Sequence, residues 1–311
     1  MAPATVLITE TQIHPDAAAL LAGHRLVYTG AKVAEDDLVE VCRQERPDAI
    51  LARYGSITRR VLLASPRLRV VARHGVGMDA IDTAAARSLG IAALPALGSN
   101  SQAVAEHTLG MMLAIARQLS WLDQRMHQGH WDKDGYLGTE LAGRTLGVVG
   151  CGSIGGRVAR FALGIGMQVA VCEPYLDASR IPDGAVRVQD IDALIARSDV
   201  VTLHCPLDDS TRGLLDESRI GRLRKGAIVI NAARAGLLDE TAMRARLVSG
   251  DIYLGLDCFV DEPLPPDSAW LTTPRTLFTP HVGGTTDRGL RGMAVGAAEN
   301  IVRHLGLTAA A

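Results

Sequence analysis

The stretch Leu146-Gly147-Val148-Val149-Gly150-Cys151-Gly152-Ser153-Ile154-Gly155 decides how this chain folds. Its first four residues form a short apolar run, as in a buried strand. From Arg157 to Leu163 the apolar residues have helical spacing, and Gly164 ends the predicted helix. The glycines therefore lie in a turn between a strand and a helix. Such a turn lets the backbone approach a ligand closely, and the helix N-terminus beyond it favours an anion.

An acidic residue follows at the distance that this turn requires. Residues 167–172 predict a second strand, and Glu173 comes directly after it, about 20 residues beyond the glycines. A carboxylate there accepts hydrogen bonds from the ribose hydroxyls of a dinucleotide and repels a 2′-phosphate. We therefore predict an NAD site. The nearby Arg180 keeps NADP as a second possibility. The alternative to both is a glycine turn that binds no ligand.

Composition narrows the class of protein. The chain has 311 residues, enough for two domains, and its net charge of −2 without a basic cluster indicates neither nucleic acid nor an anionic membrane as partner. No apolar run reaches the ~18 to 20 residues of a spanning helix, and the N-terminus lacks the pattern of a signal peptide. The five cysteines are scattered without a CxxC pair, so we expect a cytoplasmic protein with no metal and a small-molecule substrate.

Alternating apolar runs and helical segments predict an α/β protein with two Rossmann-like parallel-sheet domains. We expect a substrate domain at 1–98 plus 285–311, an NAD-binding domain at 99–284, and a cleft between them. The expected strands are 6–8, 25–28, 49–52, 69–72 and 91–94 in the first domain, and 146–149, 169–171, 200–203, 228–230, 254–257 and 276–278 in the second.

Two long helical patterns flank the second domain. The pattern from Ser101 to Gln128 is apolar on more than one face, which predicts one helix that also packs on a partner subunit, and hence a homodimer. The last helix, Asp287 to Leu305, is expected to return to the first domain.

Charged residues after predicted strands are the candidates for chemistry. Arg234 follows the strand at 228–230 and could hold a carboxylate through two parallel hydrogen bonds. His281 follows the strand at 276–278, where an imidazole could move a proton near neutral pH, although most histidines have no such role. The acids that could orient it are Asp257, Asp261 and Glu262, and the residues alone do not choose among them.

Two arginines could contact the part of the substrate that lies beyond its reacting carbon. Arg53 and Arg73 each follow or end a predicted strand of the first domain, and they could meet a phosphate or a second carboxylate. Each could equally be a surface or inter-domain charge.

These motifs, in this order, resemble those of the D-isomer-specific 2-hydroxyacid dehydrogenases over essentially the whole chain. The family includes phosphoglycerate, hydroxypyruvate and D-lactate dehydrogenases. The matching stretches are 73–77, 100–106, the glycine turn with Glu173, 204–207, 231–236, 257–263 and 279–284.

The resemblance implies a set of site residues. The catalytic set is Arg234, Glu262 and His281, with the glutamate identified as the one directly before a proline. Cofactor contacts are implied at Gly150, Gly152, Ser153, Ile154, Gly155, Glu173, His204, Cys205, Pro206, Thr211, Ala232, Ala233, Asp257, His281 and Gly283. Substrate contacts are expected at Arg53, Tyr54, His74, Val76, Gly77 and Arg234, with the N–H groups of Val76 and Gly77 on the carboxylate.

The implied activity is an NAD-dependent oxidoreductase that interconverts a D-2-hydroxy acid and its 2-oxo acid by hydride transfer, with His281 as general acid and base. Two alternatives remain open. One is an NAD-sensing binding protein of the same fold, and the other is an enzyme acting on formate or phosphite.

Overall fold

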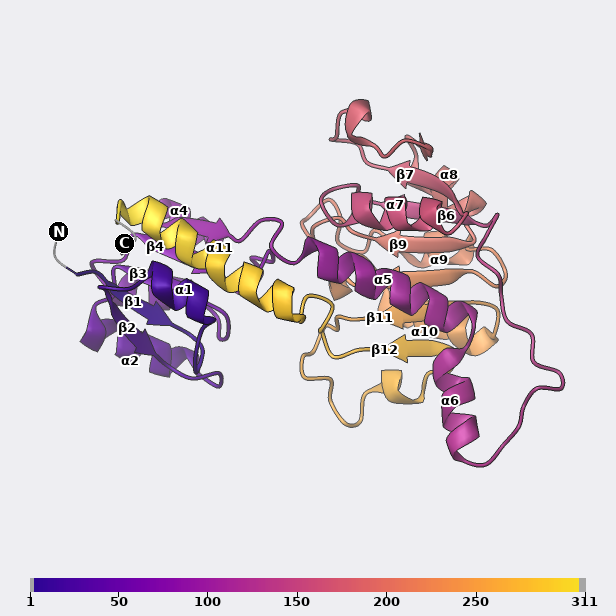
Figure 1. Ribbon diagram of the computed structural model, residues 1–311, viewed down its shortest axis with the longest axis horizontal. Helices are drawn as coiled ribbons and strands as arrows, with labels where there is room; N and C mark the ends of the chain where they lie inside the picture. Colours follow the sequence, from indigo (N-terminus) through magenta and orange to yellow (C-terminus); the bar gives the residue numbers. More distant parts are fainter. Residues whose placement is uncertain (1–2, 308–311) are drawn as a thin grey trace. The chain divides into compact units, whose positions relative to one another are not determined.

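The computed structural model describes residues 3–307. The chain divides into two compact units, which Figure 1 shows in ribbon form. Unit 1 comprises residues 1–100 and 285–311, and unit 2 comprises residues 101–284.

Unit 1 is built on a parallel sheet of five strands in the order β2-β1-β3-β4-β5. This is the flavodoxin-like order, in which the chain reverses direction beside its first strand. The strands are β1 (Thr5–Ile8), β2 (Arg25–Tyr28), β3 (Ala49–Ala52), β4 (Val70–Arg73) and β5 (Ala92–Pro95). The helices are α1 (Pro15–Leu20), α2 (Glu35–Glu45), α3 (Arg59–Ala64), α4 (Thr83–Ser88) and α11 (Asp287–Leu305).

Both faces of this sheet are buried, because successive side chains of one strand pack into the cores on opposite faces of the sheet. In β1, Leu7 packs with α2, α3 and α4, whereas Val6 and Ile8 pack with α1 and α11. Figure 1 shows α11, in yellow, running beside α1 across the sheet. The last helix thus packs on the same sheet as the first residues of the chain.

Unit 2 contains a parallel sheet of seven strands in the order β12-β11-β10-β9-β6-β7-β8. The order reverses between β6 and β9, which is the switch point where α/β sheets bind ligands. The strands are β6 (Thr145–Val149), β7 (Gln168–Cys172), β8 (Ala185–Arg187), β9 (Val200–Leu203), β10 (Ile228–Asn231), β11 (Tyr253–Leu256) and β12 (Thr276–Phe278).

The helices of unit 2 cover both faces of its sheet, with α5 and α7 on one face and α8, α9 and α10 on the other. Their bounds are α5 (Ser101–Ala116), α6 (Leu119–His127), α7 (Gly155–Gly164), α8 (Ile191–Arg197), α9 (Glu217–Gly221) and α10 (Glu240–Ser249). Short 3₁₀ turns lie at Ala178–Arg180, Ala235–Leu237 and Ala269–Thr272. The predicted fold class, two parallel-sheet α/β domains, is confirmed.

One helix prediction was wrong. The single helix expected from Ser101 to Gln128 is two helices, α5 and α6, separated at Gln118, whose φ is +49°. The segment after α6 ends the first helix, because Thr139 N–H donates to the Ala116 carbonyl at 2.8 Å and the Tyr136 hydroxyl donates to the Arg117 carbonyl at 2.7 Å. The apolar pattern alone could not reveal these distant partners.

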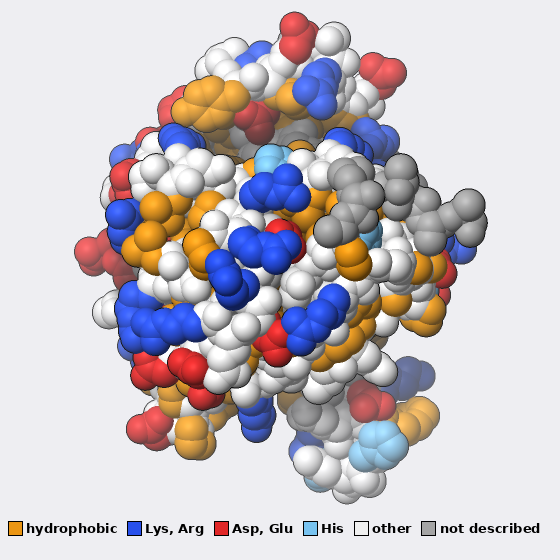
Figure 2. All heavy atoms as spheres, turned by 90° about the vertical axis from the view of Figure 1, so that its left-hand side faces the viewer, with side chains coloured by type: hydrophobic (Ala, Val, Ile, Leu, Met, Phe, Trp, Pro, Cys, Tyr) orange, Lys and Arg blue, Asp and Glu red, His pale blue; other side chains and the backbone are white. Residues whose placement is uncertain are grey.

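The face of the molecule drawn in Figure 2 carries side chains of both charges. Figure 2 shows basic side chains lying among acidic and apolar ones on the face in view. Among residues 3–307, the helices include none that combines the length and apolar character needed to cross a membrane.

Candidate active site

The predicted cofactor residues and the predicted catalytic residues both lie along the carboxyl edge of the unit 2 sheet, since parallel strands all end at the same edge. The glycine turn follows β6, Glu173 follows β7 and His204 follows β9. The predicted catalytic residues Arg234, Glu262 and His281 follow β10, β11 and β12, which are neighbours in the sheet. The fold therefore brings the predicted cofactor and catalytic residues to one edge.

The glycine turn has the shape that a pyrophosphate requires. Gly150 has φ +88°, which side chains rarely adopt, and a Cβ on it would lie 2.6 Å from the Cys205 nitrogen. A Cβ on Gly155 would overlap the Gly150 carbonyl, so this glycine lets α7 pack against the turn. A Cβ on Gly152 would meet nothing within 4 Å, so the backbone is open to a ligand there. Ser153 and Ile154 complete the turn, and Ser101 of α5 donates to the Ser153 hydroxyl at 2.9 Å.

Glu173 is joined to this turn. Its Oε2 accepts from the Cys151 N–H at 3.0 Å, and its Oε1 accepts from the Tyr175 N–H at the same distance. The carboxylate is thereby held beside the glycines, where the ribose of a dinucleotide would lie. These residues fit NAD.

His204 lies on the adjacent loop, directly after β9. Its Nε2 lies 2.9 Å from the Thr202 hydroxyl, and its Nδ1 is buried without a hydrogen-bond partner in the described chain. Burial lowers the pKa of His204 to about 4, so the ring is neutral at pH 7. The same loop carries Cys205, Pro206 and Thr211, and the Thr211 hydroxyl donates to the Pro206 carbonyl at 2.7 Å.

The loop that carries Arg234 is shaped by a buried asparagine. Asn231, the last residue of β10, accepts on its Oδ1 from the N–H groups of Ala233 and Arg234, at 3.1 and 3.3 Å. Its amide donates to the Arg234 carbonyl at 2.8 Å. Residues 232–234 are thus fixed at the strand end, and the guanidinium of Arg234 is half-buried there.

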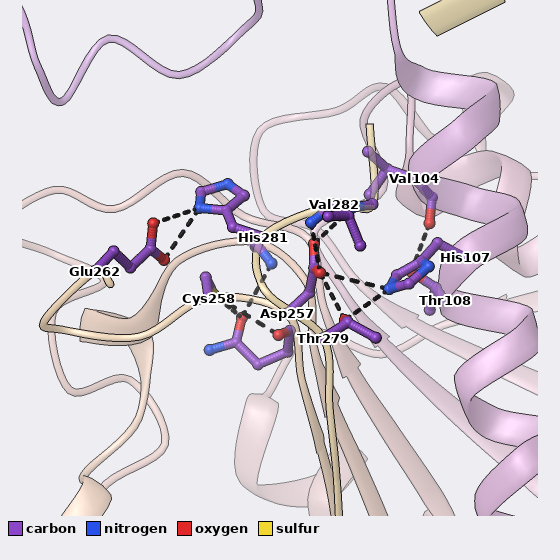
Figure 3. Close-up of polar contacts among 12 residues, drawn as sticks. Val104, His107, Thr108, Asp257, Cys258, Glu262, Thr279, His281 and Val282 are labelled. Carbon is purple, nitrogen blue, oxygen red and sulfur yellow. Dashed lines mark hydrogen bonds and ion pairs between the residues drawn. The ribbon is translucent and has the colours of Figure 1, made fainter. Parts of the chain in front are cut away.

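His281 and Glu262 point toward one another from adjacent loops (Figure 3). The Nδ1 of His281 lies 2.8 Å from Oε2 and 3.0 Å from Oε1 of Glu262. Because a carboxylate only accepts, Nδ1 carries the proton, and Nε2 is left to exchange a proton with a ligand. The side chains are 50% and 38% exposed, so the pair is open to a substrate.

Asp257 binds residues on both sides of His281 in the chain. Its Oδ1 accepts from the Thr279 hydroxyl at 2.6 Å and the Val282 N–H at 2.9 Å, and its Oδ2 accepts from the Gly283 N–H at 2.8 Å. Burial works against ionisation, but these hydrogen bonds and the nearby His107 ring, whose Nε2 lies 3.5 Å from Oδ1, outweigh it and lower the pKa of Asp257. His281 itself has φ +54°, a conformation that this anchoring maintains.

A histidine that the sequence did not identify completes this network. His107 reaches from α5, and its Nε2 lies 2.9 Å from the Thr279 hydroxyl (Figure 3). That hydroxyl already donates its proton to Asp257, so it accepts from His107, and Nε2 carries a proton. The available signal was the position of His107 in the otherwise apolar helical series with Val104 and Met111.

The expected substrate residues of unit 1 gather at the carboxyl edge of its own sheet. Arg53 and Tyr54 follow β3, whereas His74, Val76 and Gly77 follow β4. The described chain supplies no hydrogen-bond acceptor to the N–H groups of Val76 and Gly77. Sequence reasoning missed Glu10, which follows β1 and forms an ion pair with Arg53 at 2.6 Å.

Within residues 3–307 no cluster of His, Cys, Asp and Glu side chains could hold a metal ion. The site residues described above supply an imidazole with its carboxylate, a guanidinium and a dinucleotide turn.

The chain is similar to known proteins in sequence and in fold. The family model for the D-isomer specific 2-hydroxyacid dehydrogenase NAD-binding domain matches residues 109–283. The chain is 34% identical to a hydroxypyruvate reductase of Thermotoga maritima, over 93% of this chain and 94% of that protein. It is 36% identical to a D-3-phosphoglycerate dehydrogenase of Methanocaldococcus jannaschii, over 96% of this chain but 57% of that longer protein.

Solved structures agree. The D-lactate dehydrogenase of Aquifex aeolicus, solved with NAD and lactic acid, superposes with a TM-score of 0.85 at 27% identity and covers 97% of this chain and 95% of its own. The TT0316 protein of Thermus thermophilus reaches a TM-score of 0.88 at 31% identity, with 98% of each chain covered. The resemblance expected from the sequence is confirmed, and the chain belongs to the D-isomer specific 2-hydroxyacid dehydrogenases, a family of NAD-dependent oxidoreductases.

Proposed function

We propose that the chain interconverts a D-2-hydroxy acid and its 2-oxo acid, with Arg234, Glu262 and His281 as the catalytic residues. The observation that carries this assignment is the His281–Glu262 pair, at 2.8 Å, on the same sheet edge as the glycine turn. An orienting carboxylate on one imidazole nitrogen leaves the other to move a proton.

NAD, when bound, supplies the hydride acceptor, and NADH the hydride donor. Gly150, Gly152 and Gly155 would hold its pyrophosphate at the N-terminus of α7, and Glu173 would accept from a ribose hydroxyl. On the neighbouring loops, we assign contacts with the rest of the cofactor to His204, Cys205, Pro206, Thr211, Ala232, Ala233, Asp257 and Gly283.

Two residues of the chain handle the substrate's reacting oxygen. In oxidation, Nε2 of His281 accepts the hydroxyl proton, and Glu262 stabilises the imidazolium that results. In reduction, the same nitrogen returns the proton to the carbonyl oxygen. Arg234 stabilises negative charge that develops on that oxygen, as a preorganised cation does in other active sites. We assign the substrate carboxylate to the N–H groups of Val76 and Gly77.

The assignment is tested by following NADH absorbance with a panel of 2-oxo acids and their D- and L-hydroxy acids. We expect turnover with at least one 2-oxo acid, oxidation of the D isomer only, and loss of activity in His281→Ala with retained NADH binding. NADH binding without turnover of any 2-oxo acid would support the alternative of an NAD-sensing protein. Turnover of formate or phosphite alone would contradict the substrate class.

We also propose that the chain forms a homodimer through α6 and the segment that follows it. Not one residue of α6 is buried in the single chain. Leu119, Trp121 and Met126 are 53%, 45% and 52% exposed, and Trp131 and Leu137 after the helix are 75% and 86% exposed. Large apolar side chains gathered in this way are characteristic of protein–protein interfaces.

Sedimentation equilibrium should give twice the chain mass of 33.0 kDa. Replacing both Trp121 and Met126 with Glu should give the single-chain mass, because charges would be buried unpaired in the interface. A wild-type protein of single-chain mass at tens of micromolar would refute the dimer.

A cytoplasmic location is proposed from the cysteines. All five are free thiols, and burial raises the pKa of Cys42 and Cys205 to about 11 and that of Cys258 to about 12. Buried free thiols of this kind fit a reducing compartment. Cell fractionation would test the location.

A further inference from the structure

Helix α5 carries an imidazole that reaches the segment holding His281. The helix packs on β10, β11 and β12, and its His107 lies beside residues 279–283, which we call the histidine loop. Nε2 of His107 lies 2.9 Å from the hydroxyl oxygen of Thr279, where the loop begins. A Cβ on Gly283, where the loop ends, would lie 3.4 Å from Cδ2 of the same ring. One imidazole ring therefore lies beside both ends of the histidine loop.

The direction of the hydrogen bonds in this cluster is set by Asp257. A carboxylate only accepts, so the Thr279 hydroxyl donates its single proton to Oδ1 of Asp257 at 2.6 Å. The hydroxyl oxygen is then left to accept from Nε2 of His107 (Figure 3). The chain of bonds thus runs from His107 through Thr279 to the carboxylate that binds the N–H groups of Val282 and Gly283.

Loss of the His107 donor would loosen this chain of bonds. The side chain of Asp257 is only 3% exposed and that of His107 is 22% exposed, so the cluster is largely closed to water that could replace a lost donor. Without His107 the Thr279 hydroxyl could turn about its C–O bond, and its bond to Asp257 would no longer be held in one orientation. The histidine loop depends on such anchors, because it keeps His281 at φ +54°.

We propose that His107 is a positioning residue for catalysis. By donating to Thr279, it keeps the histidine loop in the arrangement that aims Nε2 of His281 at the reacting oxygen of the substrate. The inference rests on the proposed dehydrogenase function. Catalysis is sensitive to such placement, because an error of about 1 Å can cost about 10²-fold in rate. Since Asp257 would keep its charge and its backbone donors without His107, the effect should fall on kcat and not on binding.

Two replacements of similar length separate the donor from the space that the ring fills. His107→Gln keeps an N–H group within reach of Thr279, whereas His107→Met fills the space without a donor. In steady-state NADH oxidation with a 2-oxo acid, His107→Met should lower kcat about tenfold and change KM less than about twofold, and His107→Gln should restore most of the rate. Thr108→Val is the matched control, because it removes only a 2.8 Å bond to the Val104 carbonyl within the same helix (Figure 3). It should leave kcat near wild type.

The same contact can be tested from the side of Thr279. Thr279→Ser keeps the hydroxyl and should keep kcat, whereas Thr279→Val should lower it. In the Thr279→Val protein, adding His107→Met should lower kcat by less than about twofold, because the acceptor is already gone. Full and independent losses at the two positions would overturn the proposal, and so would equal kcat in His107→Met and wild type. If His107→Met did not fold, equal kcat in the two Thr279 variants would overturn it.

A second readout requires no turnover. In ¹⁵N NMR of the histidine rings, the wild-type signals of His281 should report a proton on Nδ1. His107→Met should shift or broaden those signals, whereas Thr108→Val should not. Unchanged His281 signals in His107→Met would refute the positioning role. Failure of the wild type to reduce any 2-oxo acid, with this NMR response present, would refute the dehydrogenase function alone.

Discussion

His281 occupies a backbone conformation that few residues other than glycine adopt. At φ +54° it costs free energy, and Asp257 offsets this cost by binding the backbone on its C-terminal side and Thr279 on its N-terminal side. Glu262 then fixes the ring itself. The histidine is therefore oriented twice, once through its backbone and once through its side chain.

The side-chain partner can be tested by removing its charge. Glu262→Gln keeps the size of the group but no longer stabilises an imidazolium, so kcat should fall about tenfold, while His281→Ala should lose about 10²-fold or more. Steady-state NADH oxidation measures both. Asp261→Asn is the matched control on the same loop, and it should stay near wild type. Equal losses in the Asp261 and Glu262 variants would contradict the assignment.

The backbone anchor predicts a different signature. In Asp257→Asn one acceptor becomes an amide donor that faces an N–H group, so the unfolding free energy should fall by about 1 to 3 kcal/mol. The loop of His281 would also loosen, lowering kcat about tenfold. NADH binding should weaken as well, because Asp257 is also assigned to the cofactor. Kinetics and NADH fluorescence titration separate the two effects. Wild-type kcat and wild-type NADH affinity in Asp257→Asn would contradict both roles assigned to Asp257.

Among the elements, the β6–α7 turn shows how neighbouring glycines serve different purposes. Gly155→Ala would push a methyl group into the Gly150 carbonyl, so we expect a loss of about 1 to 3 kcal/mol in stability. Gly152→Ala adds a methyl group in open space, so its thermal midpoint should hold while NADH binding weakens. Thermal denaturation and NADH titration of both variants test this. The prediction fails if Gly152→Ala binds NADH normally.

At the scale of the whole molecule, acid stability depends on buried neutral histidine. The folded pKa of His74, about 4, lies below its ordinary value of 6.5, so the unfolded chain binds more protons between these values. Stability is full above pH 6.5 and decreases as pH falls toward 4, by about 3 kcal/mol in total.

Urea unfolding at several pH values measures this contribution. His74→Leu cannot bind the proton, so the stability of unit 1 should decline less than wild type between pH 6.5 and 4. If the unfolding free energy of both proteins decreased equally over that interval, the pKa of His74 would not be lowered in the folded state.

Local sequence was sufficient to predict strand β6, the glycine turn after it and the position of Glu173, because all three depend on residues close together in the chain. The parallel pairing of the strands in both sheets also agrees with the alternating pattern, whereas the order of the strands came from the structure. The prediction of a single helix from Ser101 to Gln128 was wrong, because the contacts that end α5 come from Tyr136 and Thr139.

The sequence by itself determined two α/β domains, the NAD-binding turn and the residue types at the strand ends, since these follow from periodicity and spacing. The resemblance already implied Glu262 as the acid that acts with His281. Only the tertiary structure placed His107 on Thr279 and Glu10 on Arg53, pairs separated by 172 and 43 positions. The physical reason is that parallel strands distant in sequence end at one edge, and burial then determines which of the gathered charges stay paired.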